Sequence, residues 1–306
     1  MIAMSLDDAV QQACVAVGIK RPQRKLSAGQ WVRTDTEGKN GKNDAAVFLD
    51  SDRLSGIAYN YQTAQSQRFR IGEAQDKPSP APWRDEARER RAEEERREVA
   101  RICAALVAGC RQDRHGYLDK KGFPEELGLV CDDPREFFPS TRLGDLLGKS
   151  LPEGKGPFLI IPGRIGGKIT TVQFITVEGE KKNIFRGVMN GASHRIATGR
   201  ESWVCEGIGT ALTVRAALRL LGVNATVLSA FSASNVGKVA EALAGARIAA
   251  DHDKPVETLD GLGAGEFYAR RSGRKWIMPP ALGDWNDMHT QQGLRAVALH
   301  LREALG

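Results

Sequence analysis

The spacing of hydrophobic and polar residues changes several times along the chain, and each change marks a new segment. Residues 5–17 have apolar positions three and four apart, which predicts an amphipathic helix that begins after Ser5 and ends before Gly18. Residues 31–71 contain short runs of strand-forming residues separated by Gly, Asn and Asp. This second pattern is typical of a small antiparallel sheet with hairpin turns.

A proline-rich stretch follows this predicted sheet. Residues 76–83 hold three prolines in eight positions, which favours an extended linker. Residues 84–101 contain seven arginines and seven acidic residues, and opposite charges recur at the three- and four-residue spacing that stabilises a solvent-exposed helix. A coiled coil or an arm that binds nucleic acid is the alternative, but the apolar seam that it needs is missing before Val99.

The second half of the chain predicts a meander of strands and then alternating strands and helices. Residues 157–190 contain three strand-like runs with glycine in the turns. From residue 201 on, strand-like and helix-like segments alternate, which predicts a parallel α/β sheet. We therefore expect an α+β protein of four parts: a small mainly antiparallel β domain at 1–75, a linker and charged helix at 76–112, a basic β-rich part at 113–200, and an α/β domain with a Rossmann-like parallel sheet at 201–306.

The composition excludes several classes of protein. Of the 306 residues, 41% are hydrophobic, which is enough for folded cores, and no run approaches the roughly 20 apolar residues of a membrane helix. The N-terminal segment carries acidic residues where a signal peptide carries basic ones, so we expect a cytoplasmic protein without a membrane partner. The five cysteines are widely spaced and form no CxxC pair, which argues against a zinc ribbon.

The formal net charge of +6 is concentrated in one segment. Residues 151–200 contain eight Lys or Arg residues and three acidic residues, a net charge of +5, whereas residues 201–289 have nine basic and ten acidic residues. A basic surface of this kind suits nucleic acids and nucleotides. For any single residue, a solvated β surface is the simpler explanation.

Acidic residues follow three of the predicted parallel strands. Glu206 comes directly after the run SWVC, Asp251 and Asp253 follow RIAA, and Asp284 lies shortly after KWIMPP. The carboxyl ends of parallel strands meet at one edge of a sheet, where ligands bind. Carboxylates gathered there repel one another unless a cation lies among them, and oxygen ligands suit Mg²⁺ or Mn²⁺. Each acid taken alone is also explained as a helix N-cap or a solvated loop residue.

One tempting motif is excluded. The run RLGDLLGKS at 142–150 has three residues between its first glycine and the GK pair, where a phosphate loop has four. No apolar strand precedes the run either. We therefore expect no phosphate loop in this chain.

The order and spacing of the acids resemble those of a Toprim domain, the catalytic fold shared by bacterial-type primases, type IA and II topoisomerases and some nucleases. The pattern is present here as Glu206-Gly207, Asp251-His252-Asp253 and the run DWND at 284–287. HGYLDKKG at 115–122, the β-rich run from LIIPGR to NIFRG, EGIGTAL, AFSASNVGKVA and GDWND are similar to the Toprim primases of plasmids and phages, which are often fused to a helicase. Residues 115–306 carry this resemblance well, and residues 30–71 carry it weakly.

The resemblance implies a DNA primase, which makes short RNA primers on single-stranded DNA from ribonucleoside triphosphates in plasmid or phage replication, by two-metal phosphoryl transfer with Mg²⁺ or Mn²⁺. It implies metal ligation by Asp251, Asp253 and Asp284, with Asp287 as a further ligand or a helix cap, and acid-base work or metal contact by Glu206. It also implies contacts to nucleic acid or nucleotide by basic residues: Lys121, Arg164, Lys168, Arg186 and Arg195. No helicase sequence follows Gly306, so unwinding is expected from a separate helicase.

One departure from the family and two other functions stay open. Bacterial and many phage primases carry an N-terminal zinc ribbon that reads the template, and this chain lacks the cysteines for it. Either the N-terminal sheet takes that role without metal, start-site choice is relaxed, or priming has been lost. The alternatives to a primase are a non-catalytic single-stranded DNA-binding accessory protein and a Toprim nuclease. Four acids beside DNA would repel it, which argues against a pure binding protein.

Overall fold

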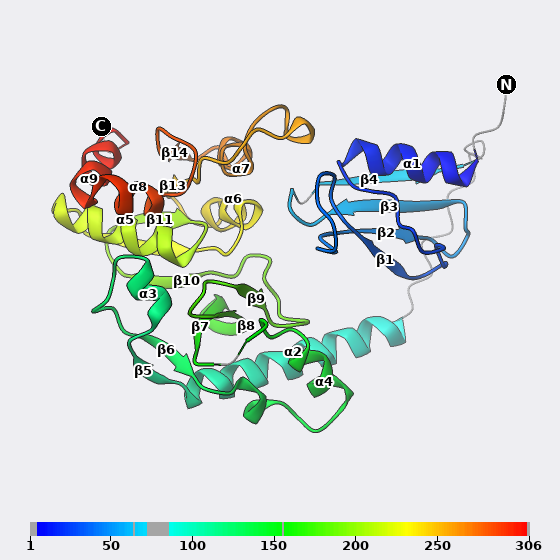
Figure 1. The fold of residues 1–306 in the computed structure, drawn as a ribbon, viewed down its shortest axis with the longest axis horizontal. Coiled ribbons are helices and arrows are strands. Elements are labelled where there is room, and N and C mark those ends of the chain that lie inside the picture. The colour runs from blue at the N-terminus through cyan, green and yellow to red at the C-terminus, as the bar shows by residue number, and fades with distance from the viewer. Residues whose placement is uncertain (1–4, 64, 72–85, 155, 305–306) are drawn as a thin grey trace. The chain divides into compact units, whose positions relative to one another are not determined.

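The computed structural model describes residues 5–63, 65–71, 86–154 and 156–304. The chain divides into two compact units, Met1–Trp83 with Pro255–Leu262, and Arg84–Lys254 with Gly263–Gly306. The described residues form helices and three separate sheets (Figure 1), so the expected α+β class with several parts is confirmed. The predicted linker at 76–83 lies outside the described residues. The finer boundaries at 112 and 200 stay predictions.

The first unit packs one helix against an antiparallel sheet. The predicted N-cap Ser5 forms a capping box with Asp8 at the start of helix α1 (Leu6–Ala16). Apolar side chains of α1 and alternate residues of the sheet, such as Val47 and Phe69, form the core. The strands pair in the order β1 (Trp31–Thr34), β2 (Ala45–Leu49), β3 (Ser55–Asn60) and β4 (Ser66–Arg70). The short 3-10 helix η2 (Glu257–Leu259) also belongs to this unit.

The second unit begins with a long helix that supports an antiparallel sheet. The second half of helix α2 (Glu86–Gly109) buries Val99 and Leu106 in a core shared with Phe158 and Phe174 of the sheet. The sheet order is β5 (Arg111–Asp113), β6 (Gly128–Cys131), β7 (Phe158–Ile165), β8 (Lys168–Ile175) and β9 (Lys181–Asn183). Helix α3 (Gly116–Lys120), the 3-10 helix η1 (Pro134–Phe137) and helix α4 (Arg142–Gly148) connect strands, and α4 occupies the run excluded as a phosphate loop.

The other sheet of the second unit is the predicted parallel sheet. Its order is β10 (His194–Ala197), β12 (Ala225–Ser229), β11 (Glu201–Cys205), β13 (Arg247–Ala249) and β14 (Lys275–Ile277), with β10 antiparallel at one edge and the others parallel. One face carries α5 (Ile208–Leu220), α8 (Trp285–Gln292) and α9 (Leu294–Glu303). The other face carries α6 (Ala233–Glu241) and α7 (Ala264–Arg271), so both faces are covered, as parallel sheets require.

The two sheets of the second unit are joined around helix α5. Leu118 of α3 and Leu159 of β7 share a core cluster with Ile208 and Leu212 of α5. One turn further along α5, the buried Arg215 guanidinium donates two hydrogen bonds to the Glu126 carboxylate, of 2.8 and 2.6 Å. A bidentate pair of this kind fixes orientation as well as distance. The N-terminal turn of α5 is therefore held against the β-rich part.

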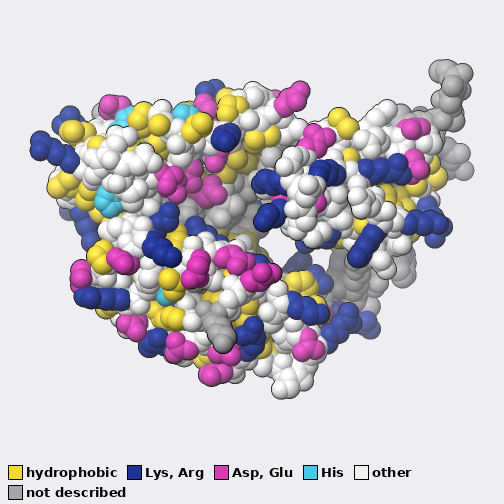
Figure 2. All heavy atoms as spheres, in the orientation of Figure 1, with side chains coloured by type: hydrophobic (Ala, Val, Ile, Leu, Met, Phe, Trp, Pro, Cys, Tyr) yellow, Lys and Arg dark blue, Asp and Glu magenta, His cyan; other side chains and the backbone are white. Residues whose placement is uncertain are grey.

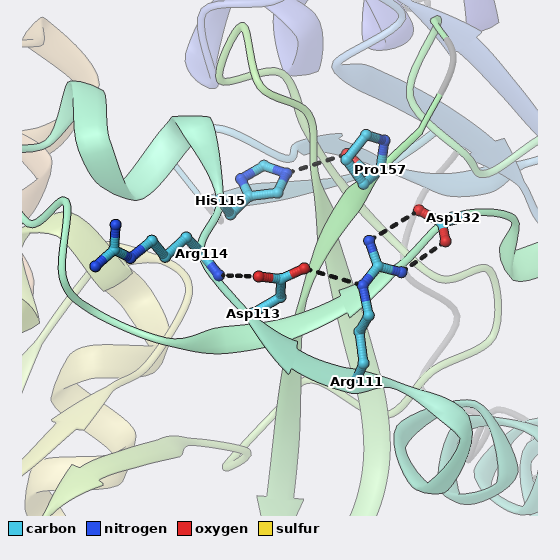
Figure 3. A network of polar contacts seen from close by, with 6 residues as sticks. All are labelled: Arg111, Asp113, Arg114, His115, Asp132 and Pro157. Carbon is cyan, nitrogen blue, oxygen red and sulfur yellow. Dashed lines mark hydrogen bonds and ion pairs between the residues drawn. The ribbon is translucent and has the colours of Figure 1, made fainter.

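A polar network orders the start of α3 (Figure 3). Arg111 donates a bidentate pair to Asp132, at 2.6 and 3.1 Å, and its Nε donates to Asp113. The His115 ring caps α3: Nδ1 accepts from the Tyr117 amide at 3.2 Å, and this leaves Nε2–H to donate to the Pro157 carbonyl at 3.0 Å. His115 thus has the structural role of a helix cap, and it sets the direction in which α3 presents its residues.

No helix in the described part of the chain is long and apolar enough to cross a membrane. The five cysteines are free thiols, and all but Cys110 are buried.

Candidate active site

Four acidic residues lie at the carboxyl ends of three neighbouring parallel strands. Glu206 follows β11 directly, Asp251 and Asp253 follow β13, and Asp284 follows β14 and begins α8. Because β11, β13 and β14 are adjacent in the sheet, these positions share one edge. All four residues are half-buried. Figure 2 shows acidic side chains gathered on the visible face of this unit, with basic side chains close by.

Two of the four carboxyl groups, those of Glu206 and Asp251, have a raised pKa. Burial and the neighbouring Asp253 and Asp284 raise the pKa of Glu206 from its ordinary 4.5 to about 7, and the nearby Lys181 ammonium opposes this rise. Burial, followed by Glu206 and the other two aspartates, raises the pKa of Asp251 well above its ordinary value. Without a cation, this edge of the sheet therefore retains protons at a pH where ordinary carboxyl groups are ionised.

Backbone and hydroxyl donors fix the two aspartates that follow β13. The Thr210 hydroxyl, in the first turn of α5, donates to Asp251 Oδ1 at 3.3 Å. The Gly265 amide, in the first turn of α7, donates to Asp253 Oδ2 at 2.8 Å. Position 265 requires glycine, because a Cβ there would lie 2.2 Å from the carbonyl oxygen of Asp251. The first turns of two helices, one on each face of the sheet, thus hold the segment Asp251-His252-Asp253, which we call the DxD segment.

The DWND run at 284–287 forms the start of α8 and holds Asp284 in place. Asp284 Oδ1 accepts from the Asp287 amide at 2.8 Å, and Asp287 Oδ2 accepts from the Asp284 amide at 3.0 Å, which completes a capping box. Asp287 therefore has the role of a helix cap, and metal ligation by it stays a prediction. Backbone hydrogen bonds between His252 and Gly283 join this run to the DxD segment.

The two buried residues of DWND connect the site to its surroundings. The Trp285 indole donates to the carbonyl of Ala250, the residue before Asp251, at 3.0 Å. The Asn286 amide donates to the Lys121 carbonyl at 2.8 Å and to the Thr213 hydroxyl at 3.1 Å. Asn286 thus ties the segment that contains Lys121 to the parallel sheet.

A divalent cation fits this donor set. The groups are carboxylates, which are the ligands that Mg²⁺ and Mn²⁺ prefer, and the repulsion by neighbouring acids that helps to raise the pKa of Glu206 and of Asp251 makes positive charge favourable among them. Within the described residues, no three His, Cys, Asp or Glu side chains lie close enough together to form a ready-made metal cage. Mg²⁺ commonly binds through one or two carboxylates and completes its shell with water and substrate phosphates, so such a cage is not required.

Two lysines from the β-rich part reach the acidic edge. The Lys121 side chain lies over Gly209 in the first turn of α5, where a Cβ would be only 3.3 Å from its Cδ. The Lys181 ammonium lies next to Glu206 and Gly207. Both ammonium groups lie over the ring of the buried Tyr117, at 6.0 and 5.5 Å from its centroid. Among the candidates from the sequence, Lys121 therefore lies beside the first turn of α5, the helix that begins directly after Glu206-Gly207.

Lys181 was missed as a site residue by the sequence interpretation. It was counted among the basic residues of 151–200 but not selected, because no motif marks it. Its neighbour Lys182 bonds instead to the Leu151 carbonyl and to Glu180. Strand alternation predicts that these two lysines point to opposite faces, but only the tertiary structure, which places the Lys181 ammonium near the N-cap residue Gly207 of α5, shows which of them meets Glu206.

Arg164 and Arg195 line a separate cleft of about 790 Å³. The cleft lies between β7, β10 and α5, and its walls include Leu118, Ile196 and Leu212. None of the four acids lines it. The structure thus places these two arginines in one cleft with residues of α5 and without any of the four acids. Their predicted contact with nucleic acid stays a prediction.

The remaining two basic candidates lie elsewhere. Lys168 is exposed at the turn between β7 and β8. Arg186 pairs with Glu95 of α2 at 3.3 Å, and both side chains are about half exposed. Arg186 also has a φ of +63°, in the left-handed region that non-glycine residues rarely adopt. The five basic candidates are therefore distributed over several places rather than forming one cluster.

Three histidines near the site have structural partners. His252 Nδ1 bonds to the Pro279 carbonyl at 2.9 Å, so its ring has a structural partner. His194 is half-buried and bonds to the Pro162 carbonyl at 3.1 Å, and burial lowers its pKa to about 4. His289 is half-buried and packs against Phe123.

No known protein-family profile matches the sequence. Among solved structures, the chain is similar to the primase fragment of the bacteriophage T7 primase-helicase protein, with 15% identity, a TM-score of 0.37, and coverage of 62% of this chain and 69% of that one. It is also similar to the zinc-binding and RNA polymerase domains of the Aquifex aeolicus primase, with 13% identity, a TM-score of 0.40, and coverage of 99% of this chain and 85% of that one. Scores this low give no residue-by-residue correspondence.

Proposed function

We propose that the second unit is a Toprim-type DNA primase, a nucleotidyltransferase that makes short RNA primers on single-stranded DNA. The observation that carries the proposal is the group of four carboxyl groups at the ends of β11, β13 and β14, two of them with raised pKa values, beside Lys121 and Lys181. This arrangement supports phosphoryl transfer, because acids that bind cations and bases that bind phosphates meet at one sheet edge. The order of the motifs supports the Toprim type.

The residues of this chain have distinct roles in the proposed reaction. The 3′ hydroxyl of one nucleotide attacks the α-phosphorus of the next, the bond to pyrophosphate breaks, and the hydroxyl proton is lost. Glu206, whose pKa is about 7, can accept that proton near neutral pH. Lys121 and Lys181 bind the negative charge of the triphosphate and of the departing pyrophosphate.

Asp251, Asp253 and Asp284 would hold Mg²⁺ or Mn²⁺, which would neutralise the phosphates and activate the attacking hydroxyl when bound. Thr210, Gly265 and the capping box of α8 keep the three aspartates in fixed orientations. Such fixed orientation limits the reorganisation that charge transfer would otherwise require. Asp287 Oδ2 already caps α8, so Asp287 would bind a metal through its other oxygen.

The basic residues outside the acidic edge complete the proposal. Arg164, Arg195 and Lys168 would bind the phosphates of the single-stranded template, and Arg186 would do so once it is released from Glu95. The plasmid or phage setting, the cytoplasmic location and the separate helicase rest on the motif resemblance and composition alone. They are not needed for the chemistry.

Primer synthesis tests the proposal directly. The full chain is mixed with single-stranded DNA, labelled ribonucleoside triphosphates and Mg²⁺ or Mn²⁺, and short oligoribonucleotides are separated by gel. We expect products with the wild type and a loss of at least about a hundredfold with Asp251→Ala. Glu241→Ala, which removes an exposed acid from α6, is the matched control and should remain active. DNA binding without synthesis indicates an accessory protein, and strand cleavage indicates a nuclease; either result overturns the proposal.

A further inference from the structure

The sheet of the first unit has one buried face and one open face. Strand β3 shows a strict alternation, in which Gly56, Ala58 and Asn60 are buried and Ser55, Ile57 and Tyr59 are half-exposed. The buried set packs with α1, in a core that contains Val47, Ala58 and Phe69. Residues with the opposite parity therefore point away from α1, on a face that no helix of the described part of this unit covers.

Aromatic rings occupy this open face. The pairing registers place Trp31 opposite Phe48, and Phe48 opposite Ile57. The rings of Trp31 and Phe48 are 5.3 Å apart between centroids, and those of Tyr59 and Tyr61 are 4.9 Å apart. Trp31 and Tyr61 remain 46% and 43% exposed. Exposed rings gathered on one face of a sheet are uncommon on a protein that has no partner there.

Arginines accompany the rings. The Arg33 guanidinium lies 4.3 Å from the centroid of the Tyr61 ring, and Arg68 stands opposite Ile57 on the edge strand β4. The outward positions of the four strands include no acidic residue. The acids that flank the strands lie in the turns, where each accepts hydrogen bonds from turn residues: Asp35 from the Gly41 and Asn43 amides, Asp44 from Thr36, and Asp50 and Asp52 from Ser55. The face therefore combines stacking surfaces with positive charge.

We propose that this open face binds single-stranded nucleic acid, with unpaired bases stacked on Trp31, Phe48, Tyr59 and Tyr61 and phosphates bound by Arg33 and Arg68. Aromatic side chains on an open sheet bind unpaired bases through their ring faces without reading sequence, and arginines supply the attraction for the backbone. The charge complementarity favours a polyanion over an apolar protein partner. The site lies in the first unit, so it holds whether or not the second unit synthesises primers.

Binding of a fluorescein-labelled 15-residue oligodeoxythymidylate to the full chain, followed by anisotropy, tests the affinity. Trp31→Ala and Tyr61→Ala should each raise Kd about tenfold, since one stacked base is worth a change of this size. Trp31→Phe keeps a ring and should stay within about threefold of the wild type. Val15→Ala, which removes an exposed apolar side chain from α1, is the matched control and should bind like the wild type. Thermal unfolding verifies that every variant is folded.

Two further measurements locate the site, because the second unit also carries basic residues. An oligonucleotide with 5-iodouracil, irradiated on the full chain, should crosslink to peptides that contain Trp31 or Tyr59 and Tyr61. Arg33→Ala should reduce the slope of log Kd against log salt by about 0.7, the value for one phosphate contact to a single strand, whereas Arg24→Ala, an exposed arginine outside the sheet, should not.

Several results would overturn the assignment. Crosslinks confined to residues above 86, unchanged Kd in the ring variants, or competition by a blunt hairpin duplex as strong as that by the single strand would each do so. Self-association of the chain that Trp31→Ala abolishes, without any effect on oligonucleotide binding, would identify the face as an interface between copies instead. Loss of primer synthesis in Asp251→Ala with unchanged crosslinking to Trp31 is the expected result if both proposals hold.

Discussion

The indole of Trp285 donates a hydrogen bond of 3.0 Å to the carbonyl oxygen of Ala250, the residue between strand β13 and Asp251. Both partners are buried, and Trp285 is fully enclosed in the core under the parallel sheet. The bond joins two segments that are 35 residues apart in the sequence. Because Ala250 precedes Asp251 and Trp285 follows Asp284, the bond fixes the start of the DxD segment relative to Asp284.

Replacing this indole should disturb the site more than the fold. Trp285→Phe keeps most of the apolar volume but leaves the buried Ala250 carbonyl without its indole donor, at a cost of about 1–3 kcal/mol. We expect the thermal midpoint to fall by several degrees and primer synthesis to fall about tenfold or more. Trp276→Phe, which alters a ring packed on the opposite face of the same sheet, should lower stability without a comparable loss of synthesis. Equal losses of synthesis in both variants would contradict this role of Trp285.

Asn286 should act on substrate binding through Lys121. Asn286→Ala removes the donor to the Lys121 carbonyl and to the Thr213 hydroxyl, so the segment that carries the lysine loses its attachment to α5 and α8. We expect KM for ribonucleotides to rise about tenfold while kcat changes less. Gln291→Ala, an exposed change on the same helix, is the control.

A double variant separates this route from a general loss of stability. If Asn286 acts through Lys121, then Asn286→Ala combined with Lys121→Ala should be little worse than Lys121→Ala alone, because the two changes affect one interaction. Additive losses would show that Asn286 acts by another route.

Much of this architecture can be predicted from local sequence patterns. The remaining features depend on tertiary packing. The alternation of strands and helices after residue 201 predicts the parallel sheet, and the acids at strand ends predict a shared edge, because both depend on short-range periodicity and connection rules. The pair between Arg186 and Glu95 depends on how α2 packs, which no local pattern encodes. Lys181 was missed for the same reason, since only the tertiary structure brings its ammonium near Gly207 and Glu206.

Asp251→Asn should stabilise the metal-free protein while it abolishes synthesis. Burial and three neighbouring acids raise the pKa of Asp251, so its charged form is unfavourable in the fold, and a neutral amide of the same shape removes that cost. We expect the thermal midpoint in EDTA to rise by a few degrees. Added Mg²⁺ should raise the midpoint of the wild type and have little effect on the variant, since only the wild type keeps the ligand. A variant less stable than the wild type in EDTA would contradict this electrostatic explanation.

Glu206 should make metal-free stability depend on pH. Its pKa is raised in the fold from 4.5 to about 7, so its contribution to stability is fully present below pH 4.5 and is lost as the pH rises through about 7. Glu206→Gln cannot ionise, so the difference in thermal midpoint, variant minus wild type, should increase between pH 4.5 and 7 and then level off. Thermal unfolding in EDTA across this range measures the difference. A difference that stays constant with pH would show that Glu206 keeps an ordinary pKa.

Lys181 should control the pH at which the active site works. Its ammonium opposes the rise in the pKa of Glu206, so Lys181→Met should raise that pKa further and move the acidic limb of the pH–rate profile for kcat/KM to higher pH. We also expect KM for ribonucleotides to rise, because a positive charge near the triphosphate is lost. Lys182→Met removes the same charge from the neighbouring position, where the side chain bonds to the Leu151 carbonyl and Glu180, and it should leave the acidic limb in place. If both variants shift the limb equally, the effect comes from the net charge of the sheet and not from the proximity of Lys181 to Glu206.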